Sequence, residues 1–131
     1  MERVAIVTGG SRGIGRAVAR DLARRGYAVV VDYARDQRDA EAAVEEILAA
    51  GGVAVAIRAD ATDELDVERL FAETIEAFGG VDLVVRGAPH AHTFVDAQAA
   101  RHLRAAGAVV DARQWDQGSP GRDRRGGERT S

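Results

Sequence analysis

Residues 8–15 read TGGSRGIG and lie between two stretches of different periodicity. Before them, residues 4–7 (VAIV) form an uninterrupted apolar run with β-branched side chains, which is typical of a strand buried on both faces of a parallel sheet. After them, Ile14, Val18 and Leu22 recur every four residues, as on one face of a helix. A glycine-rich turn between a buried strand and a helix is where a phosphate-binding turn belongs.

The glycines of this turn suit a bound phosphate. Gly9 permits a sharp turn out of the strand, and Gly13 lets the backbone approach a pyrophosphate with no side chain in the way. Gly15 lets the helix lie close on the sheet. The free N–H groups and the positive dipole end of the helix would then face the phosphates. The same pattern also fits an ordinary tight turn, so the rest of the chain has to discriminate.

Strands and helices continue to alternate after this turn. Buried-strand patterns cover residues 28–31, 53–57 and 81–85, and helical patterns cover residues 38–50 and, from an N-cap at Thr62 or Asp63, the stretch up to Phe78. Four strand–helix units in succession predict right-handed crossovers that feed one parallel sheet. The expected fold class is α/β: a partial doubly wound parallel sheet of four to five strands with helices on both faces.

Composition limits the kinds of protein that fit. With 131 residues, 46% of them hydrophobic, the chain has room for one domain with a modest core. It has no cysteine, no run of membrane-spanning length and no signal-peptide pattern, so we expect a cytoplasmic protein without disulfides or a membrane partner. His90, His92 and His102 lack a fourth ligand, so no metal site is expected. Asp123 and Glu128 interrupt the C-terminal arginines, which argues against nucleic acid as a partner.

The glycine turn resembles that of a known family. Residues 8–15 match the T-G-x-x-x-G-x-G loop of the short-chain dehydrogenase/reductase family residue for residue, and the following strand–helix units arrive where that family has them. The resemblance covers residues 1–88 and implies the dinucleotide-binding half of a Rossmann fold. It also implies an NAD(P)-dependent oxidoreductase that transfers hydride between a cofactor and a carbonyl or alcohol. An unrelated α/β domain, such as a flavodoxin-like module, is the alternative.

The resemblance also implies a set of cofactor-binding residues. An aspartate after the third strand accepts a hydrogen bond from the adenine amino group in the family, and Asp60, with Ala61 beside it, falls at that position; a helix-capping carboxylate is the other interpretation of Asp60. Residues 31–35 (VDYAR) are similar to an Asn-Tyr-Ala-Arg stretch of NADPH-using 3-oxoacyl-[acyl-carrier-protein] reductases. The expected cofactor-binding residues are Gly9, Ser11, Arg12, Gly13, Ile14, Gly15, Tyr33, Arg35, Asp60 and Ala61.

Residues near the end of the second strand bear on which nucleotide binds. Arg12 and Arg35 could both reach a ribose 2′-phosphate, because a guanidinium matches a phosphate with paired hydrogen bonds. A carboxylate at Asp32 favours a free 2′-hydroxyl instead, unless it points away because Tyr33 occupies the cofactor side. We expect NADP(H), with NAD(H) as the alternative.

The proton-transfer residues of the family have no counterpart here. In the family a tyrosine gives or takes the proton, a lysine lowers its pKa, and a serine steadies the substrate oxygen. The only tyrosines, Tyr27 and Tyr33, lie in the cofactor half, and the chain contains no lysine. Residues 86–89 read RGAP where the family has Asn-Asn-Ala-Gly. We therefore expect no catalytic residue and no hydride transfer by the chain unaided.

The family pattern is shortened and interrupted after the fourth strand. Residues 89–111 resemble a remnant of the family's helix five and strand five, with a helix expected over residues 96–106 and a short strand over 108–110. Residues 112–131 mix Gly, Pro, Arg and acidic residues without apolar periodicity, so we expect a disordered tail, in keeping with an out-of-frame product. Trp115 is expected to pack loosely or to lie exposed.

Two alternatives to an active reductase remain open from the sequence. One is a non-catalytic nucleotide-binding or partner-binding remnant, which forms a homo-oligomer or pairs with full-length relatives through the helix expected at residues 96–106. The other is a chain that does not fold stably, since half of a doubly wound sheet leaves an apolar edge uncovered.

Overall fold

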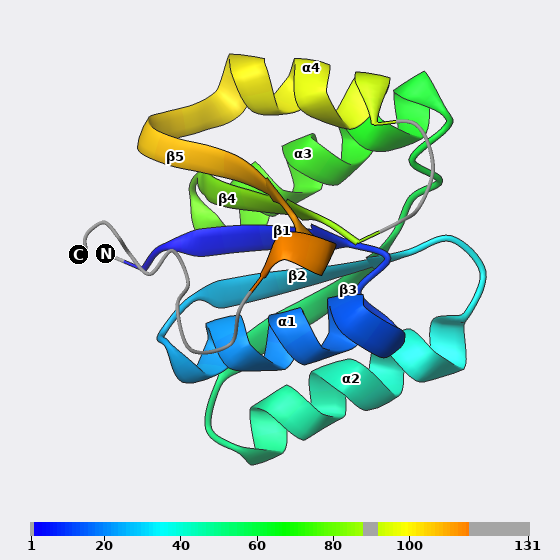
Figure 1. Ribbon diagram of the computed structural model, residues 1–131, viewed down its shortest axis with the longest axis vertical. Coiled ribbons are helices and arrows are strands. Elements are labelled where there is room, and N and C mark those ends of the chain that lie inside the picture. The colour runs from blue at the N-terminus through cyan, green and yellow to red at the C-terminus, as the bar shows by residue number, and fades with distance from the viewer. Residues whose placement is uncertain (1, 88–91, 116–131) are drawn as a thin grey trace.

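The computed structural model describes residues 2–87 and 92–115 (Figure 1). Strands and helices alternate along these residues in the order β1 (Val4–Thr8), α1 (Gly13–Arg24), β2 (Ala28–Tyr33), α2 (Gln37–Ala49), β3 (Val53–Arg58), α3 (Glu64–Phe78), β4 (Val81–Arg86), α4 (Thr93–His102) and β5 (Leu103–Asp111). A single turn of 3-10 helix, η1 (Ala112–Gln114), follows β5.

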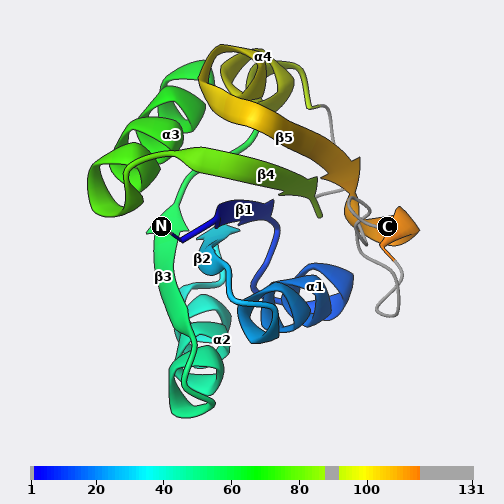
Figure 2. The same cartoon turned by 90° about the vertical axis from the view of Figure 1, so that its left-hand side faces the viewer.

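The five strands form one parallel sheet in the order β3-β2-β1-β4-β5. Helices α1 and α2 cover one face of the sheet, and α3 and α4 cover the other (Figures 1 and 2). The expected fold class is therefore confirmed. Because the chain runs outward from β1 to β3 and then returns to β4 beside β1, the strand order reverses at β1, and a crevice at the carboxyl ends of β1 and β4 is the usual ligand site of such a sheet.

Two apolar layers enclose the sheet. Ala5 and Val7 of β1 pack with α1 and α2, whereas Ile6 between them packs with α3 and α4. The same alternation occurs in β2, where Val29 and Val31 face α1 and α2 and Val30 faces the other layer. Both strands are thus buried on both faces, which is why their sequences are apolar without interruption.

The third helix begins and ends as its sequence predicts. Asp63 is the N-cap of α3, and its side chain accepts the N–H of Asp66 at 3.0 Å. Gly79 ends the helix with a φ of 90°, in the left-handed region that favours glycine. Of the two N-cap candidates, Asp63 rather than Thr62 has this role.

The boundary between the last helix and strand differs from the expectation. The helix expected over residues 96–106 is α4, which begins at Thr93 and ends at His102, and β5 already begins at Leu103. The early start of β5 has two causes, both on β4: Leu103 pairs with Val81, and the Arg104 guanidinium donates to both carboxylate oxygens of Asp82 at 2.9 and 2.8 Å. The strand expected at residues 108–110 is only the regular end of β5.

The first residues of the expected disordered tail are folded. Ala112 is buried in the layer formed with α1 and α2, and the Trp115 indole Nε1–H donates to Asp21 of α1 at 3.1 Å. Trp115 is therefore partly buried and not exposed, because the buried Asp21 carboxylate offers the indole an acceptor beside an apolar layer. The remainder of that tail, residues 116–131, lies outside the described residues.

Within residues 2–87 and 92–115, every helix is too short or too polar to cross a membrane. The same residues contain no group of three or more histidines and acidic side chains that could hold a metal ion, and His90 lies outside them.

Candidate functional site

The glycine turn joins the carboxyl ends of three strands. The N–H of Gly10 donates to the carbonyl of Asp32 in β2 at 3.0 Å. The N–H of Gly87, which follows β4, lies within hydrogen-bond distance of both the carbonyl (2.9 Å) and the side-chain hydroxyl (3.1 Å) of Thr8 at the end of β1. The turn is therefore held at the point where the strand order of the sheet reverses.

Three glycines of the site are required by the backbone. Gly9 and Gly13 have φ values of 64° and 59°. A Cβ atom at Gly15 would lie 2.2 Å from the carbonyl oxygen of Gly9, so only glycine lets α1 approach the turn this closely. A Cβ at Gly13 would meet nothing within 4 Å, so the space beside Gly13 is open. The turn is therefore packed tightly against α1 at Gly15, whereas the space beside Gly13, at the start of α1, contains no protein atoms within 4 Å of an added Cβ.

The first turn of α1 has no internal anion. Its N-cap, Arg12, makes no side-chain capping hydrogen bond, and the first turn contains no acidic residue. The first N–H groups of a helix have no intrahelical acceptor, so this end can receive a phosphate. Ser11 is buried in the turn, and Ile14 is an exposed apolar side chain at its mouth.

Asp32 and Tyr33 at the end of β2 face opposite sides of the sheet. Tyr33 packs against the layer formed with α1 and α2, the face from which the glycine turn continues into α1. Asp32 lies on the face of Val30 and is 3% exposed. Burial raises the pKa of Asp32 well above its usual value; backbone N–H groups of Ala59 and Gly9 oppose this shift. Among the described residues its Oδ1 has no hydrogen-bond partner.

Arg12 and Arg35 lie near the end of β2, where the ribose of a nucleotide is expected. The Arg12 Nη2 lies 3.0 Å from Asp36 Oδ2, and its Nε lies 3.8 Å from Asp39 Oδ2. Arg35 is exposed and forms one wall of a hollow of about 450 Å³ at the start of α2. The hollow is lined by Arg35, Asp36, Gln37, Arg38, Asp39 and Glu41.

Asp60 closes a turn after β3 and does not cap α3. Its Oδ1 accepts the N–H and the hydroxyl of Thr62 at 2.9 and 2.6 Å, and these bonds hold the pKa of Asp60 below its usual value. The positive charges of Arg35 and Arg58 lower the pKa of Asp60 further. Ala61 is partly buried against the layer formed with α3 and α4.

Arg86, the last residue of β4, stands where an amide is expected by resemblance. Its Nη1 donates to Asp96 of α4, with the shorter distance 3.1 Å, so the guanidinium is paired. Among the described residues, its Nε is buried without a hydrogen-bond partner. Asp96 could not be predicted as the partner of Arg86, because α4 meets β4 only in the folded sheet.

Asp36 and Asp39 could not be recognised as site residues from the sequence. Neither is part of the T-G-x-x-x-G-x-G pattern, and their contact with Arg12 arises because β1 and β2 are neighbours and place the glycine turn beside the start of α2. The alternating charges of residues 35–39 (RDQRD) indicate a charged surface here, but no pattern in the sequence points to Arg12 as the partner.

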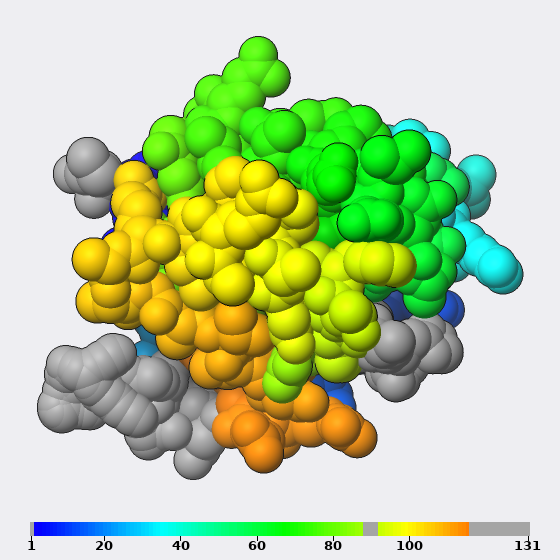
Figure 3. Space-filling view, turned by 90° about the horizontal axis from the view of Figure 1, so that it is seen from above, coloured from blue at the N-terminus to red at the C-terminus, as the bar shows by residue number. Residues whose placement is uncertain are grey.

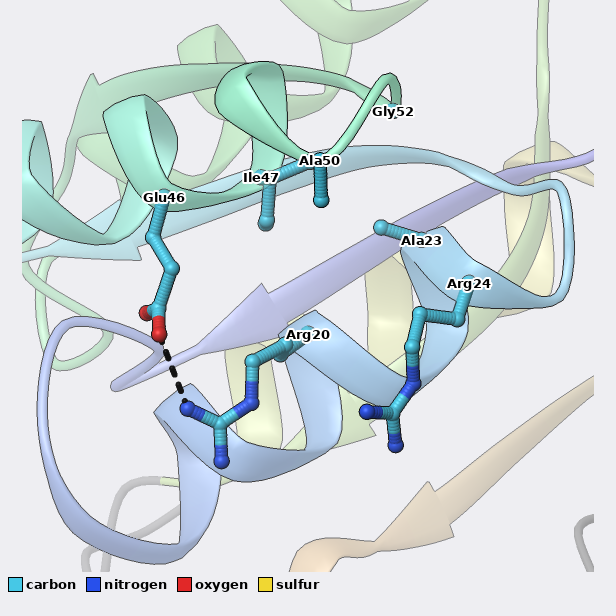
Figure 4. Close-up of a pocket in the computed structure, with 7 residues that line it drawn as sticks. All are labelled: Arg20, Ala23, Arg24, Glu46, Ile47, Ala50 and Gly52. Carbon is cyan, nitrogen blue, oxygen red and sulfur yellow. Dashed lines mark hydrogen bonds and ion pairs between the residues drawn. The ribbon is translucent and has the colours of Figure 1, made fainter.

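A second pocket lies apart from this site. Figure 4 shows it between the carboxyl-terminal halves of α1 and α2, the end of these helices away from the glycine turn. It measures about 210 Å³, Ala23 and Ile47 are among its apolar lining residues, and an Arg20–Glu46 ion pair of 3.0 Å lies at its edge. None of the expected cofactor-binding residues lines it.

Comparison with known proteins agrees with the geometry of the glycine turn. Residues 3–110 match the family model described as short chain dehydrogenase. The L-rhamnose 1-dehydrogenase (NAD(P)(+)) of Azotobacter vinelandii is 42% identical over 112 residues, which are 82% of this chain and 44% of that protein.

Solved structures share the fold. A dehydrogenase/reductase from Sinorhizobium meliloti superimposes with a TM-score of 0.75 at 38% identity, over 83% of this chain and 52% of that one. A dehydrogenase from Burkholderia cenocepacia with bound NADP has a TM-score of 0.75 at 29% identity, over 84% of this chain and 51% of its own. The chain spans about half the length of these structures and 31% to 44% of the curated relatives.

Proposed function

Because this chain belongs to the short-chain dehydrogenase family, we propose that it binds a nicotinamide dinucleotide, NADP(H) in preference to NAD(H), at the carboxyl edge of its sheet. The observation that carries the proposal is the glycine turn. Gly9 and Gly13 have left-handed φ values, the space beside Gly13 is open, and α1 begins there without an acidic side chain. These features leave room for a pyrophosphate and offer it N–H donors.

The adenosine half of the nucleotide would lie over β2 and β3. Asp60, held in place by Thr62, would accept a hydrogen bond from the adenine amino group, with Ala61 beside it. Tyr33 lies on the face of the sheet from which α1 rises, and Arg12 and Arg35 would face the ribose. The preference for NADP(H) is supported by these two guanidinium groups and by the position of Asp32, which is buried on the opposite face.

When bound, the nucleotide supplies or accepts the hydride in the interconversion of a carbonyl and an alcohol. For a complete protein of this type, we propose the activity of a 3-oxoacyl-[acyl-carrier-protein] reductase. The residues of this chain would bind and orient the nucleotide. Among residues 2–87 and 92–115, we propose none as the group that moves a proton at the substrate. Tyr27 directly precedes β2 at the amino edge of the sheet, and the Arg3 Cζ lies 4.5 Å from the centre of its ring. The chain has no lysine. We therefore propose that the chain alone is inactive in hydride transfer.

Association with another chain is a second part of the proposal. Among the described strands, β5 is paired only with β4, so the other side of β5 is an open sheet edge. Figure 3 shows β5 and η1 (orange) at the surface along one side of α4 (yellow). We propose a cytoplasmic protein that pairs with itself or with full-length relatives along this side, and sedimentation velocity with and without such a relative would test it.

Calorimetric titration with NADPH and then NADH tests nucleotide binding. Gly13→Asp places a side chain and a charge in the open space at the start of α1, and we expect it to abolish measurable binding of both nucleotides. Gly26→Asp is the matched control, because Gly26 also has a positive φ (94°), also has nothing within 4 Å of an added Cβ, and ends the turn after α1. Equal binding by wild type and Gly13→Asp would contradict the proposed site.

A further inference from the structure

Arg12 is held by two carboxylates from the start of α2. It is the N-cap residue of α1, with extended backbone, and its guanidinium contacts Asp36 at 3.0 Å and Asp39 at 3.8 Å. The Arg12 and Asp36 side chains are 67% and 42% exposed. An ion pair this exposed is weak, so a stronger anion can displace the carboxylate from Arg12.

The carboxylates of Asp36 and Asp39 also line the hollow at the start of α2, beside the proposed position of the ribose. Asp36 follows Arg35 directly and, like Asp39, lines the hollow at the start of α2. A 2′-phosphate that enters this region meets Arg35, but it also meets two negative charges, one of which already occupies Arg12. A 2′-hydroxyl brings no charge and leaves the pair between Arg12 and Asp36 intact.

We propose that Asp36, assisted by Asp39, sets the nucleotide preference of this site by competing with the 2′-phosphate for Arg12. The inference rests on the proposed function, since it concerns the ribose end of the same site. Asp32 does not have this role, because its carboxyl group is buried on the opposite face of β2. This competition lowers the ratio of NADPH affinity to NADH affinity below the value that Arg12 and Arg35 would otherwise give.

Removing the competing charge should widen the preference. We expect Asp36→Asn to strengthen NADPH binding about 2- to 5-fold and to leave NADH binding nearly unchanged, since only the phosphate gains from a freed Arg12. Asp39→Asn should act in the same direction with a smaller effect, because its contact is longer. Glu45→Gln removes one negative charge from an exposed position on the same helix and should change neither affinity.

A double-mutant cycle separates competition for Arg12 from simple repulsion of the phosphate. In an Arg12→Gln background, Asp36→Asn should strengthen NADPH binding much less than in the wild type, because no guanidinium remains to be freed and only the repulsion between Asp36 and the phosphate is relieved. A full gain in that background, or no gain in the wild-type background, overturns the inference while leaving the nucleotide site in place. If the folded wild type binds neither nucleotide, the proposed function fails, and this inference fails with it.

Discussion

Single residues of the site could be predicted from spacing only where the backbone demands one residue type. Gly9, Gly13 and Gly15 stand at fixed intervals after a buried strand. Gly9 and Gly13 are explained by their left-handed φ values, and Gly15 by the close approach of α1 to the turn. The contact of Arg12 with Asp36 could not be predicted in this way, because it depends on how far a flexible guanidinium reaches between two neighbouring segments.

Asp32 gives a prediction for stability at the residue scale. Burial raises its pKa in the folded state, so the folded state is penalised as pH rises through its usual pKa toward the raised value, and the penalty is absent below the usual pKa. Asp32→Asn should therefore stabilise the protein at pH 7 and have little effect on its stability near pH 3.

Urea denaturation at the two pH values measures this difference. Glu45→Gln controls for the loss of one negative charge at an exposed position of α2. A loss of stability in Asp32→Asn at pH 7 would show that the Asp32 carboxylate is favourably solvated in the folded state and would contradict this interpretation.

At the scale of elements, the first four strands and three helices follow from apolar periodicity and the glycines that end them. The boundary between α4 and β5 does not, because the Arg104–Asp82 contact and the pairing of Leu103 with Val81 are long-range and override the local helical pattern. Trp115 is a similar case, since its acceptor Asp21 lies near the other end of the chain.

Ala106 in β5 predicts a stabilising substitution. It is the only non-glycine residue with a positive φ (72°) among the described residues, and it lies where the pairing of β4 with β5 is irregular. Ala106→Gly should stabilise the protein by about 0.5 to 1 kcal/mol, because glycine adopts this conformation without the steric cost of a Cβ. The neighbouring Ala105→Gly should destabilise it in the same chemical denaturation experiment, and an equal effect of both would disprove the account of Ala106.

The contact of Trp115 with α1 should contribute to the stability of the protein. Trp115→Phe removes the indole N–H but keeps an aromatic ring, and it should cost about 1 kcal/mol of stability because Asp21 loses a donor. Trp115→Ala should cost about 2 to 3 kcal/mol, since the packing against the buried layer is lost as well. Wild-type stability in Trp115→Ala, measured by circular dichroism during urea unfolding, would mean that the residues after β5 do not hold to α1.

At the scale of the whole molecule, the alternation of strands and helices predicts the parallel sheet but not its completeness. The sheet ends at β5 among the described residues, whereas the solved structures that it matches are about twice as long. Both layers of the core are nevertheless closed by helices on each face, and a fully buried Phe71 lies in one of them. The described residues thus include the glycine turn and the helices that we propose to hold a dinucleotide, and the chain contains no lysine.

Equilibrium titration of the folded wild-type chain with NADPH, followed by calorimetry, tests most directly whether this half of the fold binds a dinucleotide on its own. We expect saturable binding of one nucleotide per chain, tighter for NADPH than for NADH, together with no turnover of carbonyl substrates. A folded chain that shows no saturable binding of either nucleotide would contradict it, and the glycine turn would then be a feature of the fold without a ligand.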